Sequence, residues 1–141
     1  MERGSRRKLW LPTGHIFAKP WPLGRKMHEL SLALNLLDLA EAQARQAGAT
    51  TIRTVGLRVG ALSGVMLEAL ESAFEGAKKG TLADQARLEV ERVGLAALCQ
   101  NCQCEFAVDD PHAIAVCPTC HRPSATLVRG VELQMMFLDV D

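Results

Sequence analysis

Two Cys-x-x-Cys pairs constrain the fold of this chain more than any other feature of its 141 residues. Fourteen residues separate the pairs, and the four thiols belong to Cys99, Cys102, Cys117 and Cys120. Two-residue spacing lets both sulfurs of a pair turn toward one point, and two such pairs complete a tetrahedron around a metal ion. The spacing between the pairs is close to that of zinc ribbons. The sequence therefore predicts one structural zinc ion bound by these four cysteines.

Other uses of four cysteines fit the surrounding sequence less well. A disulfide pair is disfavoured because the chain shows no secretory signal, and disulfides are rare in reducing compartments. A thioredoxin-like dithiol needs one Cys-x-x-Cys after a strand and at the start of a helix, whereas these pairs occur twice in turn-rich sequence. Four thiolates also bind iron, as in a rubredoxin-like centre, and spacing alone does not separate the two metals. Zinc is the commoner occupant, so we expect zinc in a reducing, cytoplasmic setting.

Two more residues lie beside the predicted ligands. Cys104 is near enough in sequence to replace Cys102, but the four-residue gap from Cys99 to Cys104 is less favourable than a two-residue gap. His121 follows Cys120 directly, where it is placed to act as a substitute ligand or as a hydrogen-bond donor to a sulfur. We expect Cys104 to be a free, partly buried thiol and His121 to be a solvent-exposed imidazole.

The first 26 residues differ in composition from the rest of the chain. They hold seven Lys or Arg and one acid, a net charge of +6, whereas residues 27–141 carry −6. Both tryptophans and three of the six prolines lie here, without helical or strand periodicity. We expect residues 1–26 to be a basic leader that is either disordered or translated ahead of a true start at Met27. Composition favours the second interpretation.

Residues 27–141 contain alternating helix and strand patterns. Helices are predicted at 30–46 and 65–79, and strands at 50–59, 87–93 and 131–140, from periodicities of 3.6 and 2. No βα repeat is apparent. We expect an α+β fold in which two helices cover a small three-stranded sheet, with a zinc-ribbon module inserted between two strands. The predicted parts are the leader at 1–26, an α/β domain at 27–97 with 129–141, and the zinc-binding module at 98–128.

Charge limits the function classes open to such a module. Zinc ribbons often bind nucleic acid, but residues 98–128 hold one basic residue, Arg122, against Glu105, Asp109 and Asp110. A zinc-ribbon nucleic-acid or transcription-factor-like module is therefore the alternative hypothesis, and a thiol redox protein is a third. No apolar run approaches the roughly 20 residues of a membrane helix. No catalytic Ser/His/Asp set or glycine-rich phosphate loop is present, so we expect a protein that is not an enzyme.

Several short motifs occur together in one order along residues 27–141. They are MHELSL at 27–32, LRVGALS at 57–63, an acidic helix through Glu68, Phe74 and Glu75, GT at 80–81, LEV at 88–90, the two cysteine pairs, and GVEL at 130–133. In this combination the chain resembles the HypA/HybF family of nickel metallochaperones for the maturation of nickel–iron hydrogenase. The resemblance covers residues 27–141 and leaves out the leader.

This resemblance implies a function and a set of site residues. Such proteins hold nickel(II) at their N-terminus and zinc in a separate knuckle, work with a nickel-handling maturation GTPase, and pass nickel to the hydrogenase large subunit. It implies that His28 is the nickel ligand, with the amine of Met27 and the backbone nitrogens of His28 and Glu29 as further donors. It also implies that the four cysteines hold zinc. A homodimer is compatible with this interpretation.

The donors near Met27 suit nickel on chemical grounds as well. Nickel(II) favours imidazole, amine and deprotonated amide donors in a square plane. These donors compete with protons, so we expect nickel to be released as the pH falls. If residues 1–26 remain attached, Met27 has no free amine and its amide must first lose a proton. We therefore expect a chain that starts at Met27 to bind nickel more tightly than the 141-residue chain.

Overall fold

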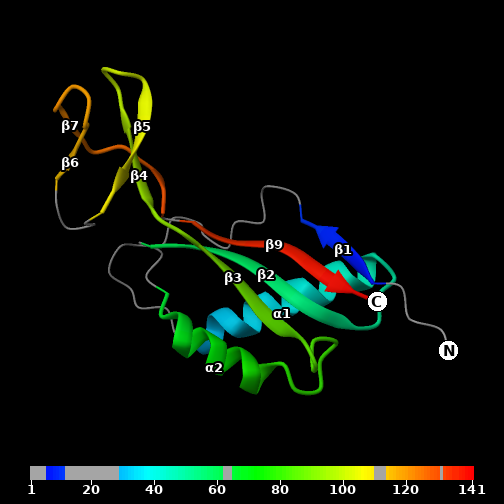
Figure 1. Cartoon of the computed structure of the whole chain (residues 1–141). Coiled ribbons are helices and arrows are strands. Elements are labelled where there is room, and N and C mark those ends of the chain that lie inside the picture. Colours follow the sequence, from blue (N-terminus) through cyan, green and yellow to red (C-terminus); the bar gives the residue numbers. More distant parts are fainter. Residues whose placement is uncertain (1–5, 12–28, 62–64, 110–113, 131) are drawn as a thin grey trace.

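The computed structural model describes residues 6–11, 29–61, 65–109, 114–130 and 132–141 (Figure 1). Helix α1 spans Glu29–Gln46, and the residues it buries recur at helical spacing. The turn after the helix contains Gly48, which has a φ of 73°. The N–H groups of Gly48 and Ala49 donate to the carbonyls of Arg45 and Ala44 at 3.0 and 2.9 Å. This pair of bonds satisfies two carbonyls that a helix end otherwise leaves without partners.

The main sheet has four strands in the order β1-β9-β2-β3. These strands are β1 (Arg7–Trp10), β2 (Ile52–Gly60), β3 (Arg87–Val93) and β9 (Leu133–Val140). β2 and β3 pair in parallel through helix α2 (Leu67–Ala77), whereas β9 runs antiparallel to both of its neighbours. The chain therefore contains one βαβ unit within a mixed sheet, although no βα repeat is apparent in its sequence.

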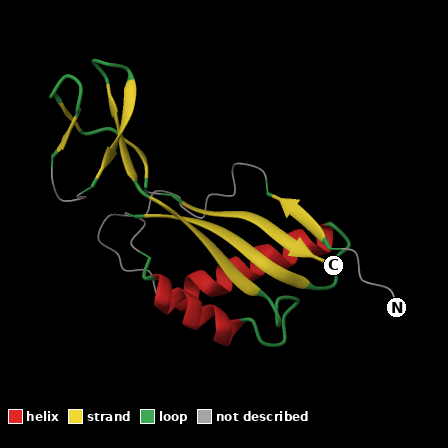
Figure 2. Cartoon of the chain, in the orientation of Figure 1, coloured by secondary structure: helices red, strands yellow, loops and turns green. Residues whose placement is uncertain are grey.

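Both helices lie on one face of the main sheet (Figure 2). Alternate residues of β2 and β9 point into the core between the sheet and the helices. The largest fully buried side chains there are Phe74, Leu32, Leu36, Ile52, Leu57, Leu70, Met135 and Leu138. Thus the predicted helices and strands of residues 27–141 are confirmed within a few residues at their ends, and they form the expected α+β layer.

The main sheet has one strand more than predicted, because part of the leader joins it. Residues Arg7–Trp10 form β1, which pairs antiparallel with the outer edge of β9. The interpretation of the leader as disordered is therefore wrong for these four residues, whereas its translation ahead of a start at Met27 stays a prediction. A strand of four residues is too short to give a clear period of two, and its partner lies at the far end of the chain.

The cysteine pairs lie in a separate module, residues 95–130, that extends from one end of the main sheet (Figure 1). A single residue, Gly94, separates β3 from the first strand of this cysteine module. Its strands are β4 (Leu95–Cys99), β5 (Cys104–Val108), β6 (Ala115–Val116), β7 (Pro123–Ser124) and β8 (Leu127–Arg129). β5, β4 and β8 form one small sheet, and β6 pairs with β7. The predicted insertion of a zinc-ribbon module between two strands of the main sheet is confirmed.

Neither helix described in the structure is long and apolar enough to cross a membrane.

Candidate metal centre

The four cysteines of the two pairs converge on one point in the cysteine module. The Sγ atoms of Cys99, Cys102, Cys117 and Cys120 all lie within 4.8 Å of one another. Those of Cys99 and Cys120 are 3.5 Å apart. Thiolates that bind zinc at about 2.3 Å from the corners of a tetrahedron lie about 3.8 Å apart. The sulfur positions therefore suit a tetrahedral metal ion, with all four corners supplied by the protein.

Each cysteine pair is followed by a residue with a positive φ. These residues are Gln103, at 57°, and His121, at 59°. Their N–H groups donate back to the carbonyls of Cys99 and Cys117, at 2.8 and 2.9 Å. The two halves of the site thus share one turn geometry, which brings both sulfurs of each pair to the same side. Glycine usually occupies such a left-handed position, and its absence here gave no sequence signal for these two residues.

The second half of the site is tied to the first by backbone and side-chain contacts. The Cys117 N–H donates to the Arg122 carbonyl at 2.9 Å, which closes the turn before β7. The hydroxyl of Ser124 donates to the carbonyl of Leu98 on β4. Phe106 packs in a small core with the buried cysteines of both pairs. The strands of this module are short and share only a small apolar core, which includes two of the four cysteines.

The thiols are so close that they influence one another's ionisation. Backbone N–H groups of Cys120 and Thr119 donate to the Cys117 sulfur and lower the pKa of Cys117 to about 6. The N–H of Arg122 likewise lowers the pKa of Cys120. A hydrogen bond with the Cys120 thiol raises the pKa of Cys102 to about 12. A divalent cation held by Cys99, Cys102, Cys117 and Cys120 would favour the thiolate form of all four, because a coordinated thiol gives up its proton.

Cys104 and His121 both lie outside the four-sulfur cluster. Cys104 pairs with Cys99 across β4 and β5 and is a free cysteine, as predicted, but it is exposed rather than partly buried. Burial of its sulfur beside the cluster nevertheless raises the pKa of Cys104. His121 is exposed, as predicted, and its contribution is the backbone turn described above.

Of the proposed nickel donors, only Glu29 falls within the described residues. Met27 and His28 fall outside the described residues, so their positions remain a prediction. Glu29 is the first described residue of α1, and it is partly buried. Glu29 therefore belongs to the first helix and not to the cysteine module.

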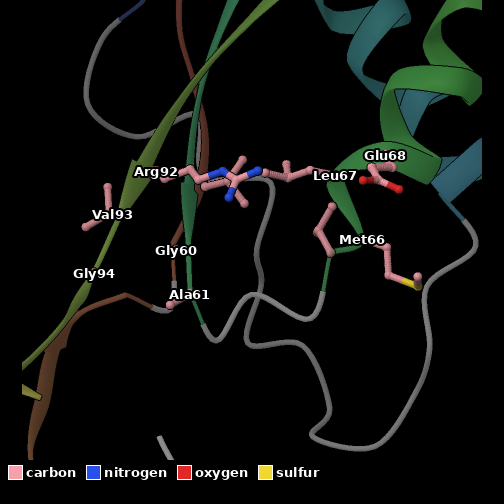
Figure 3. A pocket seen from close by; sticks show the side chains of 10 residues that line it. Gly60, Ala61, Met66, Leu67, Glu68, Arg92, Val93 and Gly94 are labelled. Atoms are coloured by element: carbon pink, nitrogen blue, oxygen red, sulfur yellow. The ribbon is translucent and has the colours of Figure 1, made fainter. Parts of the chain in front are cut away.

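A surface cavity of about 480 Å³ lies where the main sheet meets the cysteine module (Figure 3). Its lining includes the ends of β2 and β3, the start of α2, and Gly94. Arg92 and Glu68 are the charged residues in this lining, and the side chain of Met66 lies at its margin. None of the lining residues is a cysteine or a histidine, so the cavity does not offer the donors expected for zinc or nickel.

Comparisons with known proteins agree with this architecture. The family described as hydrogenase/urease nickel incorporation, metallochaperone, hypA matches residues 27–140. Hydrogenase maturation factor HypA of Chloroflexus aggregans is 39% identical over 113 residues, which is 80% of this chain and 98% of that protein. The HypA of Moorella thermoacetica is also 39% identical over 113 residues, with the same coverage.

Two solved structures share the fold. The solution structure of the Ni metallochaperone HypA from Helicobacter pylori has a TM-score of 0.58 and 26% identity, covering 81% of this chain and 97% of that one. A second HypA solution structure has a TM-score of 0.60 and 25% identity, covering 83% of this chain and 98% of that one. The family match takes in the start of α1, both cysteine pairs and β9. This chain therefore belongs to the HypA family of hydrogenase/urease nickel-incorporation metallochaperones.

Proposed function

We propose that this chain binds nickel(II) through His28, with backbone nitrogens of Met27 and Glu29, and delivers it to the large subunit of a nickel–iron hydrogenase. A nickel-handling maturation GTPase is the proposed partner, and the cytoplasm is the proposed location. The observation that carries the proposal is the family match over residues 27–140, which begins one residue before His28. The protein acts by binding and release, so no catalytic group is assigned.

We propose zinc as the resident metal of the cysteine module. The four sulfurs leave no corner of the tetrahedron for a water or a substrate, which is typical of a structural rather than a catalytic ion. Cys99, Cys102, Cys117 and Cys120 would hold it as thiolates. The chemistry that zinc supplies here is the neutralisation and cross-linking of four thiolates, which stabilises a module with little apolar core.

The described surface of the cysteine module supports protein or metal partners over nucleic acid. Among its described residues, Arg122 and Arg129 are balanced by Glu105 and Asp109. Arg129 is also paired with Glu105 at 3.0 Å. Binding to a phosphate backbone needs several unpaired basic side chains, which this surface does not offer.

Metal analysis of the purified chain tests the proposal. We expect one zinc ion per chain without added nickel, and one zinc plus one nickel ion after nickel is added and excess is removed. His28→Ala should abolish the nickel and keep the zinc. The matched control is His121→Ala, which removes an exposed histidine and should keep both metals. Nickel that survives His28→Ala, or that is lost in His121→Ala, would show that the proposed donor is wrong.

The length of the N-terminus supplies a second measurement. Calorimetry should show tighter nickel binding by a chain that starts at Met27 than by the 141-residue chain, because only the shorter chain offers an amine in place of an amide. In both chains, affinity should fall as the pH falls, since every proposed donor must be deprotonated to bind. Equal affinities of the two chains would exclude the Met27 amine as a donor.

A further inference from the structure

The outer edge of β9 is covered by a segment that lies outside the family match. β1 pairs residue by residue with β9, from Arg7 opposite Val140 to Trp10 opposite Phe137. The pairing continues one residue further, where the Leu11 N–H donates to the Met136 carbonyl at 2.9 Å. Relatives such as the Chloroflexus aggregans protein align over 98% of their length with only 113 residues of this chain, so they have no room for such a leader. β1 is therefore an addition to the part of the chain that these relatives share.

The side chains of this segment alternate between the two faces of the main sheet. Leu9 packs against the main core, and Leu11 is buried in it, with 9% of its surface exposed. Lys8 and Trp10 lie on the opposite face, where both approach Phe137. The Lys8 Nζ is 4.4 Å from the centre of the Phe137 ring, and the Trp10 and Phe137 ring centres are 5.4 Å apart. At the first distance a cation is attracted to an aromatic ring, and at the second two aromatic rings attract each other.

Arg7 fixes the start of the segment. Its Nε donates to the backbone carbonyl of Asp141 at 3.1 Å, and its Nη2 donates to the carbonyl of Ala47 at 3.1 Å. One side chain thus bridges the end of β9 and the turn after α1. Along the β9 edge, residues 7–11 therefore place an arginine at the first position, apolar residues at the third and fifth, a cation at the second and an aromatic ring at the fourth.

We infer that the outer edge of β9 is a binding site for an extended peptide, and that residues 7–11 are its built-in and displaceable occupant. The partner that the open edge fits is an extended segment of another chain that starts with a basic residue and carries apolar residues at alternate positions. Added strands of this kind gain affinity from backbone pairing and specificity from alternate side-chain positions. Displacement is feasible because the occupant is short, and because Arg7, Lys8 and Trp10 are exposed in place.

A peptide displacement experiment tests this inference on the full-length chain. A fluorescently labelled peptide of residues 6–11 (RRKLWL) is titrated with the wild type and with a Leu9→Asp, Leu11→Asp double variant, and anisotropy is recorded. In the wild type the tethered strand acts at an effective concentration in the millimolar range and excludes a micromolar peptide. The double variant detaches the strand without changing residues 27–141. We expect it to bind the peptide at least roughly tenfold more tightly than the wild type does.

If circular dichroism shows that the double variant is unfolded, two single variants, Arg7→Ala and Arg6→Ala, test the same inference. Arg7→Ala removes the bridge to the two carbonyls and should tighten peptide binding by a smaller factor than the double variant. Arg6→Ala changes a neighbouring exposed arginine outside β1 and should bind like the wild type. A peptide with aspartate in place of both leucines should not bind. Equal binding by wild type, double variant and Arg7→Ala, or binding by none of them, would overturn the inference.

Discussion

The contact between Gly56 and Phe137 gives the sharpest stability prediction. The two residues are opposite each other in the β2–β9 pair, and the Phe137 ring lies over the glycine on the face of the main sheet away from the helices. A Cβ added to Gly56 would lie 2.1 Å from the Cε1 atom of the ring and 2.4 Å from its Cδ1 atom. Carbon atoms in contact are separated by about 3.5–4.0 Å. Gly56→Ala must therefore push the ring aside by more than an ångström.

The cost follows from what the displaced ring loses. Its contact with Trp10 contributes about 0.5–1.5 kcal/mol, and the Lys8 cation above it contributes about 0.5–1 kcal/mol. Alanine in place of glycine restores about 0.5–1 kcal/mol, because it reduces the conformational entropy of the unfolded chain. We therefore expect Gly56→Ala to lower the free energy of unfolding by about 1 kcal/mol, and to raise it by about 0.5 kcal/mol when Phe137 is first replaced by alanine.

Urea unfolding of the wild type, Gly56→Ala, Phe137→Ala and the double variant measures the coupling energy between the two positions, which should be about 1.5 kcal/mol. Gly56→Ala should destabilise the wild type and stabilise the Phe137→Ala protein. The control is Gly76→Ala in α2, where an added Cβ would meet nothing within 4 Å. That change should stabilise the chain by about 0.5–1 kcal/mol through helix propensity alone. If Gly56→Ala costs the same with and without the Phe137 ring, the clash is not the cause and the argument fails.

Three other predictions concern the metal centre and the side-chain carboxylate of Asp141. His121→Gly should raise the free energy of unfolding by about 0.5–1 kcal/mol, since the relief of the left-handed backbone exceeds the added entropy of the unfolded chain. The variant should keep one zinc ion per chain, and loss of the metal would make His121 a ligand. Metal analysis should find zinc unchanged in Cys104→Ser and lost in Cys117→Ser, and a zinc-free Cys104→Ser protein would contradict the four-sulfur assignment. Hydrogen bonds from Thr50 and the neighbouring backbone lower the pKa of the Asp141 carboxyl from 3.8 to about 2. A carboxyl whose pKa is lower in the folded state than in the unfolded state stabilises the fold above pH 3.8, and this stabilisation is lost as the pH falls from 3.8 toward 2. The free energies of unfolding of Asp141→Asn and wild type, measured with urea, should therefore converge over that range. A difference that does not shrink would refute this account.

The sequence predicted the elements whose side chains face a single large core. The helix patterns around α1 and α2 and the alternation in β2, β3 and β9 arise because each element buries one face against the others. The same patterns did not show that β2 and β3 pair in parallel through α2. Pairing depends on which strand edges meet in space, and a period of two is the same for either direction.

The cysteine pairs predicted the metal centre, whereas the residues that shape it gave no signal. The spacing of the four cysteines follows from the geometry of a tetrahedron, so it is readable in one chain. The turns after each pair place Gln103 and His121 at positive φ, and neither residue type marks such a position as glycine would. For His121 the sequence suggested a side-chain role to be weighed, but the structure assigns the residue a backbone one.

The proposed division of the chain between two metals follows from the donors that each part offers. A closed set of four thiolates holds its ion without an open position, which suits a metal that stays. A cargo metal must leave again, and imidazole, amine and amide donors lose it when they gain protons. All five cysteines fall between residues 99 and 120, and none lies near the proposed nickel donors at 27–29. Because nickel and zinc both bind thiolates well, the absence of cysteine near residues 27–29 would let the proposed nickel site release its metal while the four thiolates kept zinc.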